Sequence, residues 1–156
     1  MGERGDRKAV GEGAERLCTD HSSEGRILMQ RVTGFGGLFF KAEDPEALYA
    51  WYEKHMGIKR GPEGAVSFIW RENNDKAKDG RTVWAIFPKT TTYFQPSRAD
   101  FMMNLRVADL DGLLKALKEE GVEIDPHRED YDYGRFAWIM DPEGNRIELW
   151  EPPAGG

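Results

Sequence analysis

One carboxylate in the sequence has neighbours that suit it for chemistry. Glu148 lies in an apolar stretch near the C-terminus, between Ile147 and Leu149. Because alternate residues of a strand face opposite sides of a sheet, Ile147 and Leu149 are expected to pack against helices while Glu148 faces the other side. A carboxylate placed in this way could act as a general base, bind a metal, or form a structural salt bridge with Lys41 or Arg106. The residues alone leave these alternatives open.

The same alternation groups side chains on two further predicted strands. In each strand it places aromatic or apolar residues on the same face as one or two polar groups. Such a combination is the usual make-up of a small-molecule site. The residues on these faces are Gly37, Phe39 and Lys41 from the first strand, Met102, Asn104 and Arg106 from the second, and Trp150 beside Glu148.

These strands belong to two copies of one pattern. Residues 33–88 and residues 101–152 each read as a strand, a helix and several further strands. Asp44 and Asp109 occupy equivalent places in the two copies, where an aspartate is expected to cap the start of each helix. An internal repeat of this kind predicts two similar modules, joined here by a linker at residues 90–100.

Composition and turn residues predict the other elements. The polar segment Glu72 to Gly80 is expected to form a long hairpin loop. Residues 129–133, which are acidic and aromatic, are expected to form a mobile lid or only a solvated connection. Trp51 and Tyr52 are expected to lie in the core face of the first helix. The predicted strands are residues 36–41, 66–71, 81–87, 101–107, 122–124, 135–140 and 146–150.

Charge and hydropathy exclude several classes of function. The 22 Lys and Arg residues do not cluster and are outnumbered by 28 Asp and Glu residues, which argues against a nucleic-acid partner. No apolar run approaches the length of a membrane span, so no membrane partner is expected. The single cysteine, Cys18, rules out an intrachain disulfide framework and fits a reducing compartment, so we expect a cytoplasmic protein. Residues 1–31 lack apolar periodicity and a signal-peptide core, and we expect them to form a disordered N-terminal tail or to include translated upstream sequence before a natural start at Met29.

Motifs in both modules are typical of one superfamily. The most specific is the closing stretch DPEGNRIELWEP at residues 141–152, and the Trp51-Tyr52 helix is a further match. Together with Asp44-Pro45, Met56-Gly57 and Val107-x-Asp109, these motifs resemble the vicinal oxygen chelate superfamily. That superfamily includes glyoxalase I, bleomycin-resistance and fosfomycin-resistance proteins, and extradiol dioxygenases.

The resemblance implies an α+β fold of two tandem βαβββ modules whose sheets form a cup. It covers a single domain at residues 32–152, preceding a short C-terminal tail at residues 153–156. Within the domain it implies module one at residues 32–89, the linker at 90–100 and module two at 101–152.

In superfamily members that use a metal, the ligands come from four equivalent strand positions. By position, the resemblance places Gly37, Trp84, Met102 and Glu148 there. Only Glu148 suits a hard or borderline divalent metal, because glycine has no side chain, the indole nitrogen carries a proton and a thioether suits copper. We therefore expect no cofactor. A divalent metal is disfavoured by the missing ligands, and Glu148 would be a metal ligand only if a metal is found.

The cup implied by the resemblance is instead lined mainly by aromatic side chains. Glu148 is the predicted catalytic residue. The predicted ligand-binding residues are Phe39, Lys41, Trp84, Met102, Asn104, Arg106, Trp138 and Trp150.

Three functions are compatible with the resemblance. The first is metal-independent binding of a small organic molecule, as in bleomycin-resistance proteins. The second is the chemistry of a lyase or isomerase of the lactoylglutathione lyase type, or of a dioxygenase-family enzyme, with Glu148 as base or metal ligand. The third is a non-catalytic accessory domain. The expected partner is a small-molecule ligand, and a homodimer is plausible by base rate.

Overall fold

The computed structural model describes residues 31–72 and 75–154. Nearly all of the predicted tail at residues 1–31 lies outside the described residues. The order of elements is β1 (Gly34–Ala42), α1 (Pro45–Met56), β2 (Val66–Glu72), β3 (Asp75–Pro88), β4 (Phe101–Arg106), α2 (Leu110–Glu119), β5 (Ile124–Tyr131), β6 (Gly134–Met140) and β7 (Arg146–Glu151).

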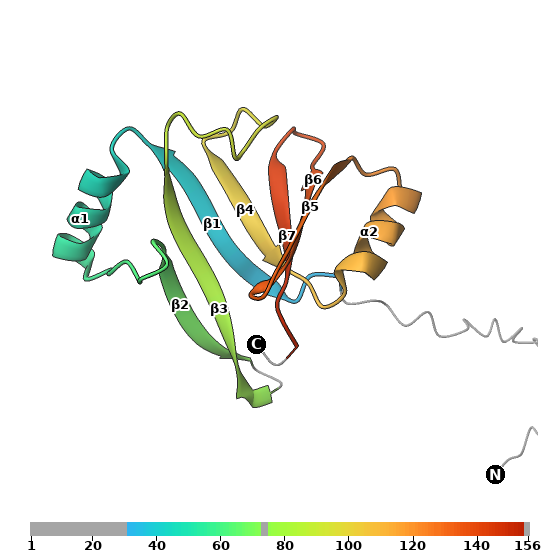
Figure 1. The fold of residues 1–156 in the computed structure, drawn as a ribbon, viewed down its shortest axis with the longest axis horizontal. Helices are drawn as coiled ribbons and strands as arrows, with labels where there is room; N and C mark the ends of the chain where they lie inside the picture. Colours follow the sequence, from blue (N-terminus) through green and yellow to red (C-terminus); the bar gives the residue numbers. More distant parts are fainter. Residues whose placement is uncertain (1–30, 73–74, 155–156) are drawn as a thin grey trace, which may run out of the picture.

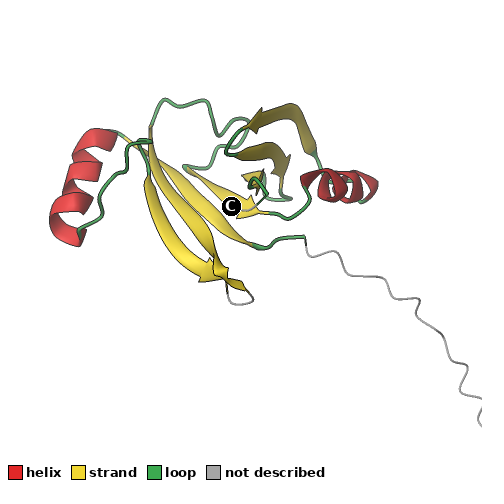
Figure 2. Cartoon of the chain, turned by 60° about the horizontal axis from the view of Figure 1, so that its bottom comes forward, coloured by secondary structure: helices red, strands yellow, loops and turns green. Residues whose placement is uncertain are grey.

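The strands form one mixed sheet in the order β2-β3-β1-β4-β7-β6-β5. The first strands of the two modules, β1 and β4, pair antiparallel at its centre. Each of them also pairs in parallel with the last strand of its own module, β1 with β3 and β4 with β7. The sheet is strongly curved, and the two helices lie at its opposite ends (Figures 1 and 2). This arrangement confirms the predicted α+β fold built from two modules.

The two modules differ in one respect. Module two has three strands after its helix, whereas in the described residues module one has two, β2 and β3. The intervening residues 58–65 contain two glycines and a proline and form turns, including a hydrogen bond from the Gly64 amide to the Gly61 carbonyl at 3.1 Å. A strand is disfavoured there because glycine and proline both weaken strand pairing.

The helix starts are as predicted. Asp44 Oδ1 accepts a hydrogen bond from the Ala47 amide at 2.9 Å, and Asp109 Oδ1 accepts one from the Gly112 amide at 3.0 Å. These bonds satisfy amides that the first turn of a helix leaves without a partner. Among the described residues, no helix is long and apolar enough to cross a membrane.

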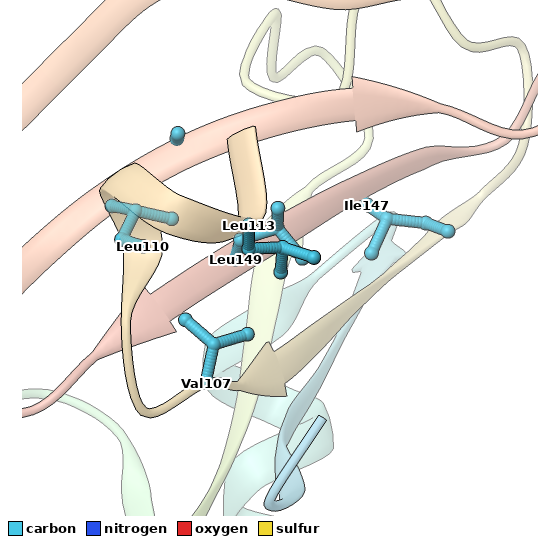
Figure 3. Close-up of a cluster of buried hydrophobic side chains, with 6 residues drawn as sticks. Val107, Leu110, Leu113, Ile147 and Leu149 are labelled. Atoms are coloured by element: carbon cyan, nitrogen blue, oxygen red, sulfur yellow. The ribbon is translucent and has the colours of Figure 1, made fainter. Parts of the chain in front are cut away.

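The helix-facing sides of the strands form two hydrophobic clusters. In module two, Leu110 and Leu113 of α2 pack on Val107, Ile147 and Leu149 (Figure 3). In module one, Tyr49 of α1 packs with Val66 and Ile86, with Trp84 beside them. The prediction that Ile147 and Leu149 pack against a helix is therefore confirmed. Glu148 lies on the opposite, concave face of the sheet.

Three expectations about local structure are wrong. The segment Glu72 to Gly80 is mostly strand, because Asp79 and Gly80 of β3 pair with Arg71 and Trp70 of β2. Only Asn73 and Asn74 of that segment lie outside the described backbone.

Of the two alternatives for residues 129–133, the mobile lid is wrong, whereas a solvated connection describes the exposed turn at residues 132–133. Residues 129–131 belong to β5 and pair with β6, which holds their backbone in the sheet. Trp51 is 46% exposed, because Tyr49 and Tyr52 supply the side of α1 that meets the sheet and Trp51 points away from it. The expectation that Tyr52 packs in the core is confirmed by its edge-on contact with Trp84.

Candidate functional site

Glu148 lies in the middle of the sheet with only 2% of its surface exposed. Its neighbours across the strands are Asn104 of β4 and Trp138 of β6. Asn104 Nδ2 donates a hydrogen bond to Glu148 Oε1 at 2.5 Å, and Trp138 Nε1 donates one to Oε2 at 3.1 Å. The Tyr93 hydroxyl donates a third hydrogen bond to Oε2. Each of these partners is a neutral donor.

On balance, the surroundings of Glu148 favour the protonated form of its carboxyl. Burial raises the pKa of its carboxyl above the ordinary value, and the hydrogen bonds from Tyr93, Asn104 and Trp138 act in the opposite direction. Burial also raises the pKa of Tyr93, and the nearby Glu148 carboxylate raises it further. Tyr93 therefore remains a hydrogen-bond donor at any physiological pH.

Tyr93 comes from the segment that the sequence predicted only as a linker. In the structure, residues 90–100 form the loop that joins the end of β3 to the start of β4 (Figure 1), and their aromatic side chains pack on the concave side of the sheet. Phe94 is fully buried there and packs with Phe39, Met102 and Trp138. We name residues 90–97 the strap. The two adjacent aromatic residues in an otherwise polar linker were the signal that could have identified it.

Arg146 fastens the strap to the sheet. One of its terminal nitrogens, Nη1, donates to the backbone carbonyls of Tyr93 at 2.9 Å and Gln95 at 2.7 Å. The other, Nη2, donates to Asp125 Oδ2 at 2.8 Å. The guanidinium also lies over the Trp138 ring, 5.0 Å from its centre. Arg146 is 9% exposed, so these contacts are largely shielded from water.

Most of the predicted cup residues lie together. Phe39, Met102 and Trp138 form one buried cluster with Phe94, and Asn104 contacts Glu148 directly. Trp150 is stacked with Phe136 at 6.5 Å, further along the same face. Arg106 lies opposite Trp150 in the pairing of β4 with β7.

Lys41 lies apart from Glu148. Its ammonium is 4.0 Å from Asp100 and 5.3 Å from the centre of the Phe94 ring. The salt bridge considered between Lys41 and Glu148 is therefore not formed, because Asp100 of the following segment lies closer to the end of β1.

The prediction that Trp84 lines the cup is wrong. It packs on the helix side with Tyr49 and Tyr52, with ring centres 5.9 Å and 4.7 Å away. On β3 the residue that faces the cup is Ala85, which pairs with Phe39. A shift of one residue along a strand exchanges its two faces, so the positional transfer placed Trp84 on the wrong side.

The residues present do not fit a metal centre. With Ala85 in place of Trp84, the four positions implied by the resemblance carry Gly37, Ala85, Met102 and Glu148, a set with one side chain that suits a hard or borderline divalent metal. Residues 31–72 and 75–154 contain no group of three or more His, Cys, Asp or Glu side chains that could hold a metal. Three neutral donors already occupy most of the acceptor positions of the Glu148 carboxylate.

Further aromatic rings, outside the predicted set of ligand-binding residues, extend the cup. His127 of β5 is stacked on Trp138 at 5.4 Å, and Tyr131 is stacked on Tyr133 at 4.9 Å. Tyr131 and Tyr133 are 48% and 58% exposed, so this end of the cup is open to solvent. The concave face thus runs from exposed rings at the β5–β6 hairpin to the buried carboxylate.

Close backbone approach explains a glycine at the floor of the cup. A Cβ on Gly36 would lie 1.9 Å from Asn104 Oδ1, well inside contact distance. Asn104 Oδ1 is buried and has no hydrogen-bond partner among the described residues. The β1 strand carries a register shift between Phe35 and Gly37, which places Gly36 against Asn104.

Comparison with known proteins gives a consistent result. A family model described as a glyoxalase-like domain matches residues 37–150. No curated protein matches the sequence. The fold is similar to methylmalonyl-CoA epimerase from Mycobacterium tuberculosis, with 21% identity, a TM-score of 0.51, and coverage of 78% of this chain and 89% of that one. It is also similar to methylmalonyl-CoA epimerase from Streptomyces coelicolor in complex with 2-nitronate-propionyl-CoA, with 14% identity, a TM-score of 0.56, and coverage of 78% and 99%. At these identities the likeness shows the fold.

Proposed function

The chain belongs to the glyoxalase-like domain family of the vicinal oxygen chelate superfamily, and from this premise we propose that it binds a small organic molecule in its cup without a resident metal. The observation that carries the proposal is the environment of Glu148. This carboxylate is buried among aromatic rings and accepts hydrogen bonds from neutral donors of the chain. Such a group recognises a donor on a ligand rather than a cation.

The aromatic lining supports an organic ligand. Phe39, Trp138 and Phe136 present ring faces or edges along the cup, and the exposed Tyr131 and Tyr133 continue them toward solvent. Aromatic side chains contribute large apolar contact areas with defined stacking geometry. A few polar groups among such rings give orientation and specificity to a bound molecule.

Two measurements on the purified full chain test this function. Metal analysis after incubation with manganese, iron, nickel, cobalt and zinc should give no stoichiometric metal. A thermal-shift screen of small organic compounds should find ligands whose effect is lost in Glu148→Gln. One tightly held metal per chain would overturn the proposal that the site binds its ligand without a metal. Ligands that raise the melting temperature of Glu148→Gln as much as that of the native chain would show that Glu148 does not take part in binding.

The second candidate function is proton transfer by a lyase or isomerase. The observation that favours it is the burial of Glu148, which raises the pKa of the carboxyl toward the range useful for a general base. In this case Glu148 would remove a proton from carbon, and the Asn104 amide beside it would be placed to donate to a developing oxyanion. Exchange of substrate protons with deuterium from solvent, abolished in Glu148→Gln, distinguishes this function from binding alone.

A further inference from the structure

The strap closes the cup over Glu148. Phe94 is fully buried against Phe39 and Met102, whereas Tyr93 is only partly buried and forms part of the outer wall. Glu148 behind it is 2% exposed. A molecule that is to touch Glu148 from solvent must therefore displace a side chain. Asn104 and Trp138 belong to strands that are paired on both sides within the sheet, whereas Tyr93 belongs to the irregular strap. Tyr93 is therefore the partner that can move at the lowest cost.

Tyr93 is held as a small aromatic ligand would be. Its ring is stacked on Phe87, with centres 5.5 Å apart and an interplanar angle of 8°. Its edge meets Trp138 at 6.1 Å and 85°. Its hydroxyl donates to Glu148. These contacts are one stacked ring, one perpendicular ring and one carboxylate acceptor, which together define a receptor for a planar ring that carries a donor.

The fastening of the strap is separate from the Tyr93 side chain. Arg146 binds the backbone carbonyls of Tyr93 and Gln95, and Phe94 is anchored in the cluster below. The Tyr93 side chain can therefore leave its place while these backbone and core contacts remain. A buried carboxylate that loses a donor is strongly destabilised, so the group that replaces Tyr93 must itself supply a hydroxyl or N–H.

We propose that the Tyr93 side chain occupies the ligand position of the cup, and that the ligands of this protein are planar rings bearing a hydroxyl or N–H donor that replace the Tyr93 phenol on Glu148. This inference rests on the proposed function and narrows it to a chemical class. It also makes Tyr93 an internal competitor whose removal opens the site.

The test uses p-cresol, which has the shape of the tyrosine side chain, and toluene, which lacks the hydroxyl. In Tyr93→Ala, saturating p-cresol should raise the melting temperature by about 4 °C or more, and toluene should bind at least about tenfold more weakly. In Tyr93→Ala combined with Glu148→Gln, the preference for p-cresol over toluene should disappear. Equal binding of the two compounds to Tyr93→Ala, or no binding of p-cresol, overturns the inference.

A milder variant keeps the test decisive if Tyr93→Ala does not fold. Tyr93→Phe retains the ring but removes the competing donor, so calorimetry should show p-cresol binding about tenfold more tightly than to the native chain. Tyr52→Phe on α1, which faces the opposite side of the sheet, is the matched control and should leave the affinity unchanged. An unchanged affinity in Tyr93→Phe contradicts the inference.

The two proposals fail in different ways. The compound screen could find ligands that need Glu148 while the Tyr93 variants do not distinguish p-cresol from toluene. In that case the proposed binding function is supported, and the proposed class of ligands is wrong. If neither the native chain nor the Tyr93 variants bind any compound, both proposals fall.

Discussion

The Tyr93 hydroxyl donates a hydrogen bond to the carboxylate of Glu148, which lies 55 residues further along the chain. This bond joins the segment between the two modules to the last strand of module two. It places an aromatic side chain of the strap against a buried acceptor on the sheet.

Replacement of Glu148 by glutamine should weaken ligand binding far more than it weakens the fold. Glutamine has nearly the same shape, but its amide nitrogen would face a donor from Tyr93, Trp138 or Asn104. We expect compounds found by screening to bind about tenfold to hundredfold more weakly, measured by calorimetry. Glu143→Gln, in the exposed turn before β7, is the control and should have no effect.

Stability should depend on pH through Glu148 in a defined direction. Because burial raises the pKa of this carboxyl above its ordinary value of 4.5, the folded state holds its proton more tightly than the unfolded state. Its contribution is therefore fully present below the ordinary value and is lost as the pH rises through the raised value.

Urea unfolding across pH 4 to 8 measures this effect as a difference between two proteins. The free energy of unfolding of the native chain, minus that of Glu148→Gln, should decrease as the pH rises. Carboxyls such as Asp111, whose pKa is lowered mainly by a hydrogen bond from Arg128, are common to both proteins and cancel. A difference that increases with pH would show that hydrogen bonding outweighs burial at Glu148.

Replacement of Gly36 by alanine should disturb the site from the backbone side. The new methyl group would lie 1.9 Å from Asn104 Oδ1, so Asn104 must move away from Glu148. We expect a loss of about 1–3 kcal/mol in the free energy of unfolding. Gly61→Ala, where the nearest atoms would lie at 3.4 Å, should be much milder in the same denaturation experiment.

Replacement of Arg146 by lysine should loosen the strap. A single ammonium cannot reproduce the planar fork that binds two backbone carbonyls and Asp125. Chemical denaturation should show a loss of about 1–3 kcal/mol. In hydrogen exchange, the amides of Gln95 and Ser97, which bond within the strap, should exchange faster than in the native chain.

A control variant separates this effect from general loss of charge. Arg128→Lys changes an arginine that pairs with Asp111 at the surface and does not touch the strap. Its effect on strap exchange should be absent. Equal acceleration in the two variants would mean that Arg146 stabilises the whole domain rather than the strap.

Local patterns predicted much of this fold because they depend on neighbouring residues. Asp44 and Asp109 cap helices by accepting hydrogen bonds from amides three residues further along the chain. This interaction depends only on nearby residues, so it can be predicted without the rest of the fold. The alternation of Ile147, Glu148 and Leu149 similarly follows from strand geometry and identified the buried carboxylate.

Other features were decided by contacts between distant segments. Trp84 was assigned to the wrong face because the correct register comes from the pairing of β3 with β1, which no local pattern encodes. The role of Tyr93 was missed because a segment without regular structure has no periodicity from which a direction can be predicted. Arg146 likewise acts on the strap, more than fifty residues earlier in the chain.

The sequence by itself therefore determined the two modules, their helices and the strand that carries Glu148. Only the tertiary structure decided which groups surround that carboxylate. Helix caps and strand alternation arise from bonds and sterics within a few residues, whereas the contacts of a buried charge depend on how separate segments pack around it. For this protein, the alternation along the strands had already placed Asn104 and Trp138 on the side of Glu148, and the packing of the strap added the Tyr93 hydroxyl as a third donor.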